Sequence, residues 1–388
     1  MKKYSKNFWA ICTSLLLFMT SFNLIIPELN DFITALGGIE YKGLIITLFT
    51  LSAAISRPFS GKLSDTIGRK STMYIGITVS TIVTFLYPLC GSVLFFLTLR
   101  FFHGFSTGFL PTGATALVTD ILPADKRGQG MGVFGTATSL GIGIGQFLGT
   151  PITKLAGVDG LFIISGILAI IAGLMILTVR ETLENPQVFA PKLLKVKKTE
   201  IIETNVIPAG IVMILTATCS GIIFVLSPDM SEYLGISNKG WFFFFYVIST
   251  IGIRLFTGKV SDKYGRRETL IAGCIVLCLS MLMVGYSESM LSFTLGAIVF
   301  GVATGINSPT LFAWMADLSP AHRRGISAGT LFIALEVGIM VGASSTLYMY
   351  ESTFKSVPQT FMVGAGFSIL ALFFLLWHLK FRKQQTTY

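Results

Sequence analysis

Several ionisable residues interrupt long uncharged stretches of this sequence, and they are the first candidates for chemistry. Arg100 and His103 are three residues apart, so in a helix they lie on the same face. A charge inside an apolar segment is costly, so it should face a cavity and have a partner. An imidazole titrates near neutral pH, so His103 could exchange protons. Alternatively, both are hydrogen-bonded structural residues.

Glu336 is the strongest acidic candidate, because it stands in the middle of an uncharged segment. In a helix, Gly338 and Gly342 fall on nearly the opposite face. If these glycines pack against neighbouring helices, the carboxylate points into a cavity, where it could bind a proton or a cationic substrate. Alternatively, it forms a buried ion pair, for example with Arg254.

The segments that carry these residues are too apolar for a soluble protein. Of the 388 residues, 52% are hydrophobic and 12% are charged, whereas soluble domains contain about 25% charged residues. Runs of about 20 apolar residues cross a bilayer, and in hydrocarbon the backbone must pair within each segment, which favours helices. The expected fold class is therefore an all-α membrane protein. The twelve expected spans are about 8–29, 43–60, 72–90, 93–119, 129–153, 160–179, 206–228, 240–258, 269–287, 290–316, 326–348 and 359–379.

The basic residues predict the orientation of these spans. Most of the 29 Lys and Arg residues fall in alternate loops, on one side of the membrane. Basic loops mark the cytoplasmic side, which places both termini and the central linker in the cytoplasm of a multi-pass inner (plasma) membrane protein. This asymmetry accounts for the net charge of +10, and a nucleic-acid partner is not expected.

Four more charged residues lie near the ends of apolar segments. Glu28 and Asp229 each follow a proline, and each is either a functional acid or a solvated helix end. Arg57 and Arg254 each stand one turn before a charged loop, where the side chain lines a cavity or extends to the interface. The sequence leaves these alternatives open.

An internal repeat divides the chain. Residues 57–71 read RPFSGKLSDTIGRKS, and residues 254–268 read RLFTGKVSDKYGRRE. Glycines, acids and arginines in later spans also recur in pairs, at the same separation in sequence as these two segments. We expect an N-terminal six-helix half at 1–180, a cytoplasmic linker at 181–205 and a C-terminal six-helix half at 206–388. Two halves of equal topology should be related by an axis along the membrane normal.

The repeated loop resembles the motif G-x-L-(a)-D-(r)-x-G-R-(k/r) of the major facilitator superfamily, and the resemblance covers essentially the whole chain. It implies a cytoplasmic latch that holds the inner helix ends together in the outward-open state. Alternatively, the loop charges only enforce topology. The implied latch residues are Gly61, Asp65, Gly68, Arg69, Asp120 and Arg127 in the first half and Gly258, Asp262, Gly265, Arg266, Asp317 and Arg324 in the second.

Two further spans resemble family motifs but depart from them. The fourth resembles l-x-x-x-R-x-x-q-G, which implies proton coupling or substrate binding for Arg100, with His103 in place of the usual glutamine. The fifth resembles the antiporter motif G-x8-G-x3-G-P-x2-G-G, with Gln146 in place of its proline and Thr150 in place of its last glycine. These departures leave the direction of coupling open. The glycines that do match are Gly132, Gly141, Gly145 and Gly149.

Together these features predict a secondary active transporter that works by alternating access. It resembles the drug/proton antiporter and sugar-efflux branches, which implies proton-coupled efflux of a small amphiphilic molecule, drug or metabolite. The alternatives are a proton symporter or facilitator that imports a small solute, and a non-transporting sensor or lipid-handling protein. We expect a monomer whose partners are its substrate, protons and the bilayer. Nucleotide-binding loops and metal or hydrolase motifs are missing from the sequence, so neither an enzyme nor a cofactor or metal is expected.

Overall fold

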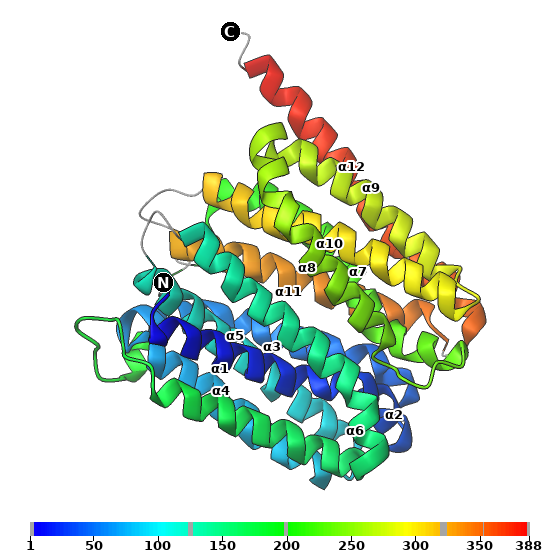
Figure 1. The fold of residues 1–388 in the computed structure, drawn as a ribbon, viewed down its shortest axis with the longest axis horizontal. Coiled ribbons are helices and arrows are strands. Elements are labelled where there is room, and N and C mark those ends of the chain that lie inside the picture. Colours follow the sequence, from blue (N-terminus) through cyan, green and yellow to red (C-terminus); the bar gives the residue numbers. More distant parts are fainter. Residues whose placement is uncertain (1–3, 123–126, 198–200, 319–323, 352, 386–388) are drawn as a thin grey trace. The chain divides into compact units, whose positions relative to one another are not determined.

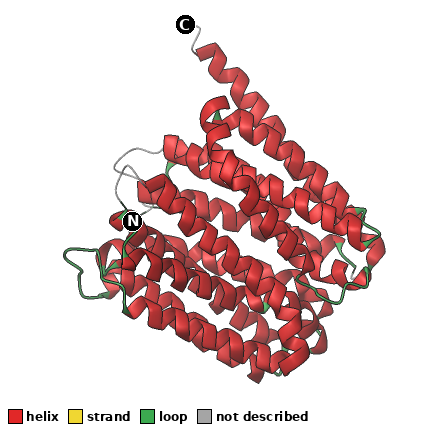
Figure 2. Cartoon of the chain, viewed as in Figure 1, coloured by secondary structure: helices red, strands yellow, loops and turns green. Residues whose placement is uncertain are grey.

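The computed structural model describes residues 4–122, 127–197, 201–318, 324–351 and 353–385. Within these ranges the chain is helical and contains no strand (Figures 1 and 2). The all-α fold class expected from the sequence is therefore confirmed. Its physical cause is that an apolar segment in hydrocarbon must satisfy its backbone hydrogen bonds internally, which a helix achieves.

The chain divides into two compact units. The first contains Met1–Gly38 and Leu48–Ile201, and the second contains Ile39–Thr47 and Ile202–Tyr388. The helices up to the linker are α1 (Lys6–Leu24), α2 (Leu29–Ala35), α3 (Lys42–Thr66), α4 (Arg69–Leu86), α5 (Val93–Ile121) and α6 (Arg127–Leu177). The helices after the linker are α7 (Ile207–Tyr233), α8 (Trp241–Tyr264), α9 (Arg266–Gly285), α10 (Met290–Leu318), α11 (Arg324–Met349) and α12 (Val357–Gln385).

The described residues contain ten helices that are long and apolar enough to cross a membrane, and α8 adds the shorter apolar stretch Trp241–Arg254. One of the ten, Val133–Leu177, covers both spans expected at 129–153 and 160–179. Helix α6 consists of two helical stretches that meet at a kink at Gly157, where φ is 73° and ψ is 174°. That conformation favours glycine, so a single residue takes the place of the expected loop.

Glycines bring α6 close to α1 in the first unit. A Cβ atom at Gly141 would lie 2.5 Å from the Leu16 oxygen, and one at Gly145 would lie 2.6 Å from the Thr20 oxygen. Only glycine permits this approach, which is the role of small residues at membrane helix interfaces. The first core cluster is built on the same helices with α4 and α5, around Phe18, Leu110 and Ala169.

Glycines also bring α11 close to α7 in the second unit. A Cβ atom at Gly338 would collide with the Ile214 oxygen, and one at Gly342 would collide with the Thr218 oxygen. The core cluster here includes Trp314 from α10. The glycine face of α11 is therefore packed against a neighbouring helix, as the sequence argument about Glu336 assumed.

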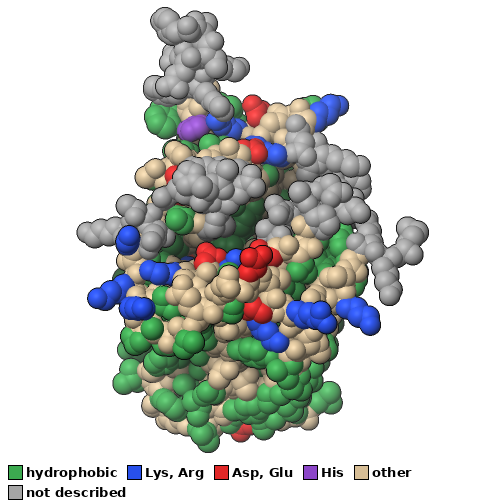
Figure 3. All heavy atoms as spheres, turned by 90° about the vertical axis from the view of Figure 1, so that its left-hand side faces the viewer, with side chains coloured by type: hydrophobic (Ala, Val, Ile, Leu, Met, Phe, Trp, Pro, Cys, Tyr) green, Lys and Arg blue, Asp and Glu red, His purple; other side chains and the backbone are tan. Residues whose placement is uncertain are grey.

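Large apolar side chains also cover the outside of the helices. Leu94 is 78% exposed and Leu155 is 88% exposed, which water would penalise but lipid would not. Figure 3 faces the left-hand side of Figure 1, where the N-terminus lies. It shows Lys, Arg, Asp and Glu side chains gathered at that end, with hydrophobic side chains along the flank. This distribution suits a protein that crosses a bilayer.

Candidate functional site

Arg100 and His103 lie in a buried polar cluster of the first unit. Ser92 caps the start of helix α5, because its hydroxyl accepts a hydrogen bond from Phe95 N at 3.3 Å. Both Arg100 and His103 lie further along this apolar helix, and neither is exposed. The Arg100 guanidinium lies 4.5 Å from the centre of the Phe49 ring. Its Nη1 donates to the Tyr87 hydroxyl at 3.4 Å. The ring and the hydroxyl both contact the buried cation.

Tyr87 also contacts His103, and it therefore links the two residues. The Tyr87 hydroxyl lies 3.1 Å from His103 Nδ1, and Ser80 Oγ lies 3.2 Å from Nε2. Because Tyr87 accepts from Arg100, its own proton is available to Nδ1, which assigns the remaining proton to Nε2 and makes Ser80 the acceptor. The arrangement thus suits a neutral imidazole.

A second polar group joins α1, its following turn and α6. Glu28 lies in the 3-10 turn Ile26–Glu28 and is 6% exposed. Thr150 Oγ1 donates to Glu28 Oε1 at 2.6 Å. Nearer the start of both helices, Gln146 Nε2 donates to Asn23 Oδ1 at 3.1 Å. Glu28 is therefore a buried, hydrogen-bonded carboxylate rather than a solvated helix end.

Asp229 lies in a third group, within the second unit. Lys42 Nζ is 2.8 Å from Asp229 Oδ2, and the two side chains are 12% and 7% exposed. The Tyr350 hydroxyl donates to the same oxygen at 2.6 Å and lies 2.8 Å from the Tyr233 hydroxyl. Burial first, and then the Asp229 carboxylate, raise the pKa of Tyr350. Tyr350 therefore remains a hydrogen-bond donor at any physiological pH.

The remaining predicted cavity residues occupy separate helices. Arg57 is buried on α3 and donates from Nη1 to Thr112 Oγ1 at 3.2 Å. Glu336 is 7% exposed on α11, and Arg254 is half-buried on α8. Arg57 thus faces another helix of its unit, which favours the interior position over an extension to the interface.

The first copy of the loop motif forms a network of ion pairs. Gly68 has φ 115° and precedes α4, which lets the chain turn sharply there. Arg69 lies 2.6 Å from Asp65 and 3.2 Å from Asp120. Glu181, which follows α6, accepts hydrogen bonds from the backbone nitrogens of Arg69 and Lys70 at 3.1 and 2.9 Å. The carboxylate thereby caps the positive end of α4.

The second copy repeats the central ion pair. Arg266 Nε lies 3.0 Å from Asp317 Oδ2, in the same relation as Arg69 and Asp120. Gly265 has φ 101°, and a Cβ atom there would collide with the Glu268 carboxylate. Gly61 has open space around its Cβ position, so packing alone does not require glycine there. The side chains of Arg127, Asp262 and Arg324, and the surroundings of Gly132 and Gly258, lie outside the described residues.

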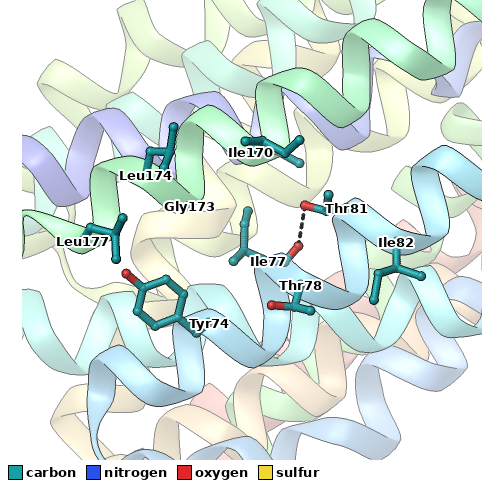
Figure 4. Close-up of a pocket in the computed structure, with 10 residues that line it drawn as sticks. Tyr74, Ile77, Thr78, Thr81, Ile82, Ile170, Gly173, Leu174 and Leu177 are labelled. Carbon is teal, nitrogen blue, oxygen red and sulfur yellow. Dashed lines mark hydrogen bonds between the residues drawn. The ribbon is translucent and has the colours of Figure 1, made fainter.

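A groove in the first unit lies away from these groups. It has a volume of about 270 Å³ and runs between α4 and α6 in the first unit (Figure 4). Its wall includes Tyr74, Thr81, Ile170 and Leu177, and Thr81 Oγ1 donates to the Ile77 oxygen. None of the residues singled out in the sequence lines it.

Sequence reasoning missed several partners of the predicted residues. Tyr87, Ser80, Lys42 and Tyr350 were not singled out, because a lone hydroxyl or a loop lysine carries no motif. Thr150 was noted only as a departure from a glycine. A polar threonine at a motif position normally held by glycine, on a packed helix face, was the one feature of the sequence that could have indicated a partner.

The family model of the Major Facilitator Superfamily matches residues 11–208 and 208–387. The chain belongs to this superfamily. The two matches together cover nearly the whole chain, so the resemblance inferred from the loop motifs is confirmed. This Major Facilitator Superfamily protein is a multi-span membrane protein and a secondary transporter of small molecules, and it is not an enzyme.

Curated relatives align over most of their length. An uncharacterized MFS-type transporter of Methanocaldococcus jannaschii is 24% identical over 95% of this chain and 97% of the relative. A multi-drug resistance efflux pump PmrA homolog of Lactococcus lactis is 26% identical over 79% of this chain and 78% of the relative. The multidrug resistance protein MdtG of Dickeya zeae is 23% identical over 91% of both chains.

A solved structure shows the same fold. The crystal structure of the human organic anion transporter MFSD10 superposes with a TM-score of 0.75, covering 95% of this chain and 98% of that one. The sequence identity is 18%, so the likeness concerns the fold alone.

Proposed function

We propose that this protein exports small amphiphilic molecules, drugs or metabolites from the cell in exchange for protons. The observation that carries the proposal is its similarity to transporters that are themselves named multidrug efflux pumps, over 79% to 91% of the chain. The proposed setting is the inner membrane, with both termini cytoplasmic and a single chain as the working unit. The basic loops support this orientation.

Buried ionisable groups supply candidates for proton coupling. Glu28 and Glu336 are 6% and 7% exposed within segments that cross the membrane. A carboxylate in such a place is costly, so its presence indicates a function that uses its charge. We assign proton exchange to these acids and a substrate or coupling role to Arg100.

The proposed mechanism is a competition between protons and substrate for these carboxylates. A protonated carboxylic acid is neutral and tolerates an apolar surrounding, whereas the ionised form attracts a cationic or polar substrate. Binding of one therefore disfavours binding of the other, which couples proton entry to substrate exit. The Arg69–Asp65–Asp120 network on the loop side would hold the inner helix ends together while the outer side is open.

The test is proton movement in proteoliposomes loaded with acid and a pH-sensitive dye. A panel of lipophilic cations and neutral amphiphiles is added outside to the wild type, Glu336→Gln and Arg100→Ala. We expect at least one solute to drive protons out of wild-type vesicles, and the response to fall at least tenfold in either variant. Entry of protons together with the solute would instead identify a symporter. Solute flux that ignores pH in all three proteins would identify a facilitator.

A further inference from the structure

The two positions at which α6 departs from the antiporter motif both face α1. Gln146 and Thr150 follow directly after Gly145 and Gly149, the glycines that bring the α6 backbone against α1. Their side chains make the two hydrogen bonds that link α6 to Asn23 and Glu28. The departures therefore introduce polar groups into an interface that the glycines have already closed.

Thr150 is buried where α6 approaches the turn that carries Glu28. It is 5% exposed. A Cβ atom at the preceding Gly149 would lie 3.3 Å from the Pro27 side chain, so α6 is close to the turn that carries Glu28. The hydroxyl donates to Glu28 Oε1 at 2.6 Å, a short distance that is typical of a hydrogen bond to a charged oxygen.

Gln146 places a buried polar side chain in the same interface, and one of its polar atoms is not satisfied there. The residue is fully buried. Its Nε2 donates to Asn23, while its Oε1 has no hydrogen-bond partner among the described residues. A buried acceptor of this kind is costly unless a water or another donor reaches it. A polar group that favours hydration therefore lies one helical turn from Thr150.

The charged residues on the elements that pack around the Glu28 turn are exposed where the structure describes their side chains. The turn packs against α1, α2 and α6. Asp31 on α2 and Lys154 and Asp159 on α6 are exposed, whereas the Thr150 hydroxyl is buried with Glu28. Lys6 begins α1, and Arg127 begins α6, at the helix ends away from Glu28.

We propose that Thr150 is the positioning residue that orients the Glu28 carboxylate, already assigned to proton exchange, and stabilises its ionised form. This inference rests on the proposed proton-coupled transport and names the α1–α6 contact as one place where the proton binds. A hydroxyl donor favours the ionised carboxylate over the neutral acid. Proton release from Glu28 thereby strengthens the hydrogen bond across the interface, and proton uptake weakens it.

The test compares Thr150→Val, which removes the hydroxyl at nearly constant volume, with Thr150→Ser, which keeps it. Transport in proteoliposomes is measured across external pH. A hydrogen bond to a charged group stabilises it enough to move a titration by about one pH unit. We expect the midpoint of the pH profile to rise by that amount in Thr150→Val and to stay at the wild-type value in Thr150→Ser.

Thr153→Val is the matched control on the same helix. The Thr153 hydroxyl donates to the Gly149 oxygen of its own helix at 3.1 Å, so its loss should leave the pH midpoint unchanged. Equal shifts in Thr150→Val and Thr153→Val would overturn the inference, as would a wild-type profile in Thr150→Val or a shifted one in Thr150→Ser.

A second readout does not depend on transport. In detergent, Thr150→Val should lower the Tm more at pH 8 than at pH 5, because the lost bond stabilised the ionised form. Glu28→Gln should abolish this pH-dependent difference between the Thr150 variants. If no solute moves protons but this pattern appears, the proposed function fails while the assignment of Thr150 to Glu28 stands. A pH-independent Tm loss would show that Thr150 only packs.

Discussion

Tyr87 is the residue on which the buried cluster of the first unit depends. Its hydroxyl accepts from Arg100 and contacts His103, so Tyr87→Phe removes one buried hydrogen-bond partner from each of them. We expect a loss of about 1–3 kcal/mol in the free energy of unfolding, measured by thermal or denaturant unfolding in detergent.

Tyr74→Phe on α4 provides the control for this variant. The Tyr74 hydroxyl is buried and has no hydrogen-bond partner among the described residues, so its removal should be nearly neutral. If the two variants lose the same stability, the Tyr87 hydroxyl does not bridge the cluster.

The spacing of Arg100 and His103 could be interpreted from the sequence, but their surroundings could not. Tyr87 stands 13 residues before Arg100, and Ser80 stands 23 residues before His103, on elements whose rotation no periodicity determines. In the same way, Glu28 finds Thr150 at a separation of 122 residues. Charges in apolar segments are visible in a sequence, whereas their hydroxyl partners look like ordinary helix residues.

Helix α3 contributes to both units. Its first turns pack in the second unit, where Thr47 Oγ1 lies 2.9 Å from Ser344 Oγ and Lys42 pairs with Asp229. Further along, Ser60 Oγ donates to the Gly108 oxygen on α5 at 2.7 Å. Helix α3 therefore has some contacts in the second unit and others in the first. The Lys42–Asp229 ion pair is the charged contact in the second unit.

A double-mutant cycle on Lys42→Met and Asp229→Asn measures this pair. Removing one partner of a buried ion pair costs about 3–5 kcal/mol, because the other charge remains buried. We expect each single variant to lose several degrees of Tm and the double variant to lose less than the sum. The exposed pair Lys239–Glu232, whose carboxylate is 64% exposed, should show coupling of about 0–1 kcal/mol in a parallel cycle. Additive losses for Lys42 and Asp229 would contradict a stabilising pair.

Hydropathy and charge could predict the helical membrane fold, because both are properties of whole segments. They could not predict that the two spans expected at 129–153 and 160–179 are joined without a loop. A kink at Gly157, whose φ is 73°, separates the two helical stretches there. Helix boundaries depend on single backbone angles, whereas the presence of a span depends on some twenty side chains.

The repeat in the sequence reappears as a repeated ion pair in the molecule. Arg69–Asp120 in the first unit and Arg266–Asp317 in the second are equivalent pairs, each joining an arginine of the loop motif to an aspartate near the end of α5 or α10. The acids are 35% and 54% exposed, and such pairs contribute about 0–1 kcal/mol to stability. Stability alone is therefore a weak explanation for both copies, and control of conformation is a better one.

This view predicts that Arg69→Gln and Arg266→Gln impair transport without unfolding the protein. Each should lower the transport rate at least fivefold in proteoliposomes while shifting Tm by less than about 2 °C, because a surface pair contributes little to the free energy of unfolding. The double variant should transport less than either single one, since both inner ends lose their ion pair. Arg180→Gln, an exposed basic residue just after α6, should behave as wild type. If transport falls only in proportion to Tm, or if Arg180→Gln is equally impaired, the loop charges enforce topology and stability and do not act as a latch.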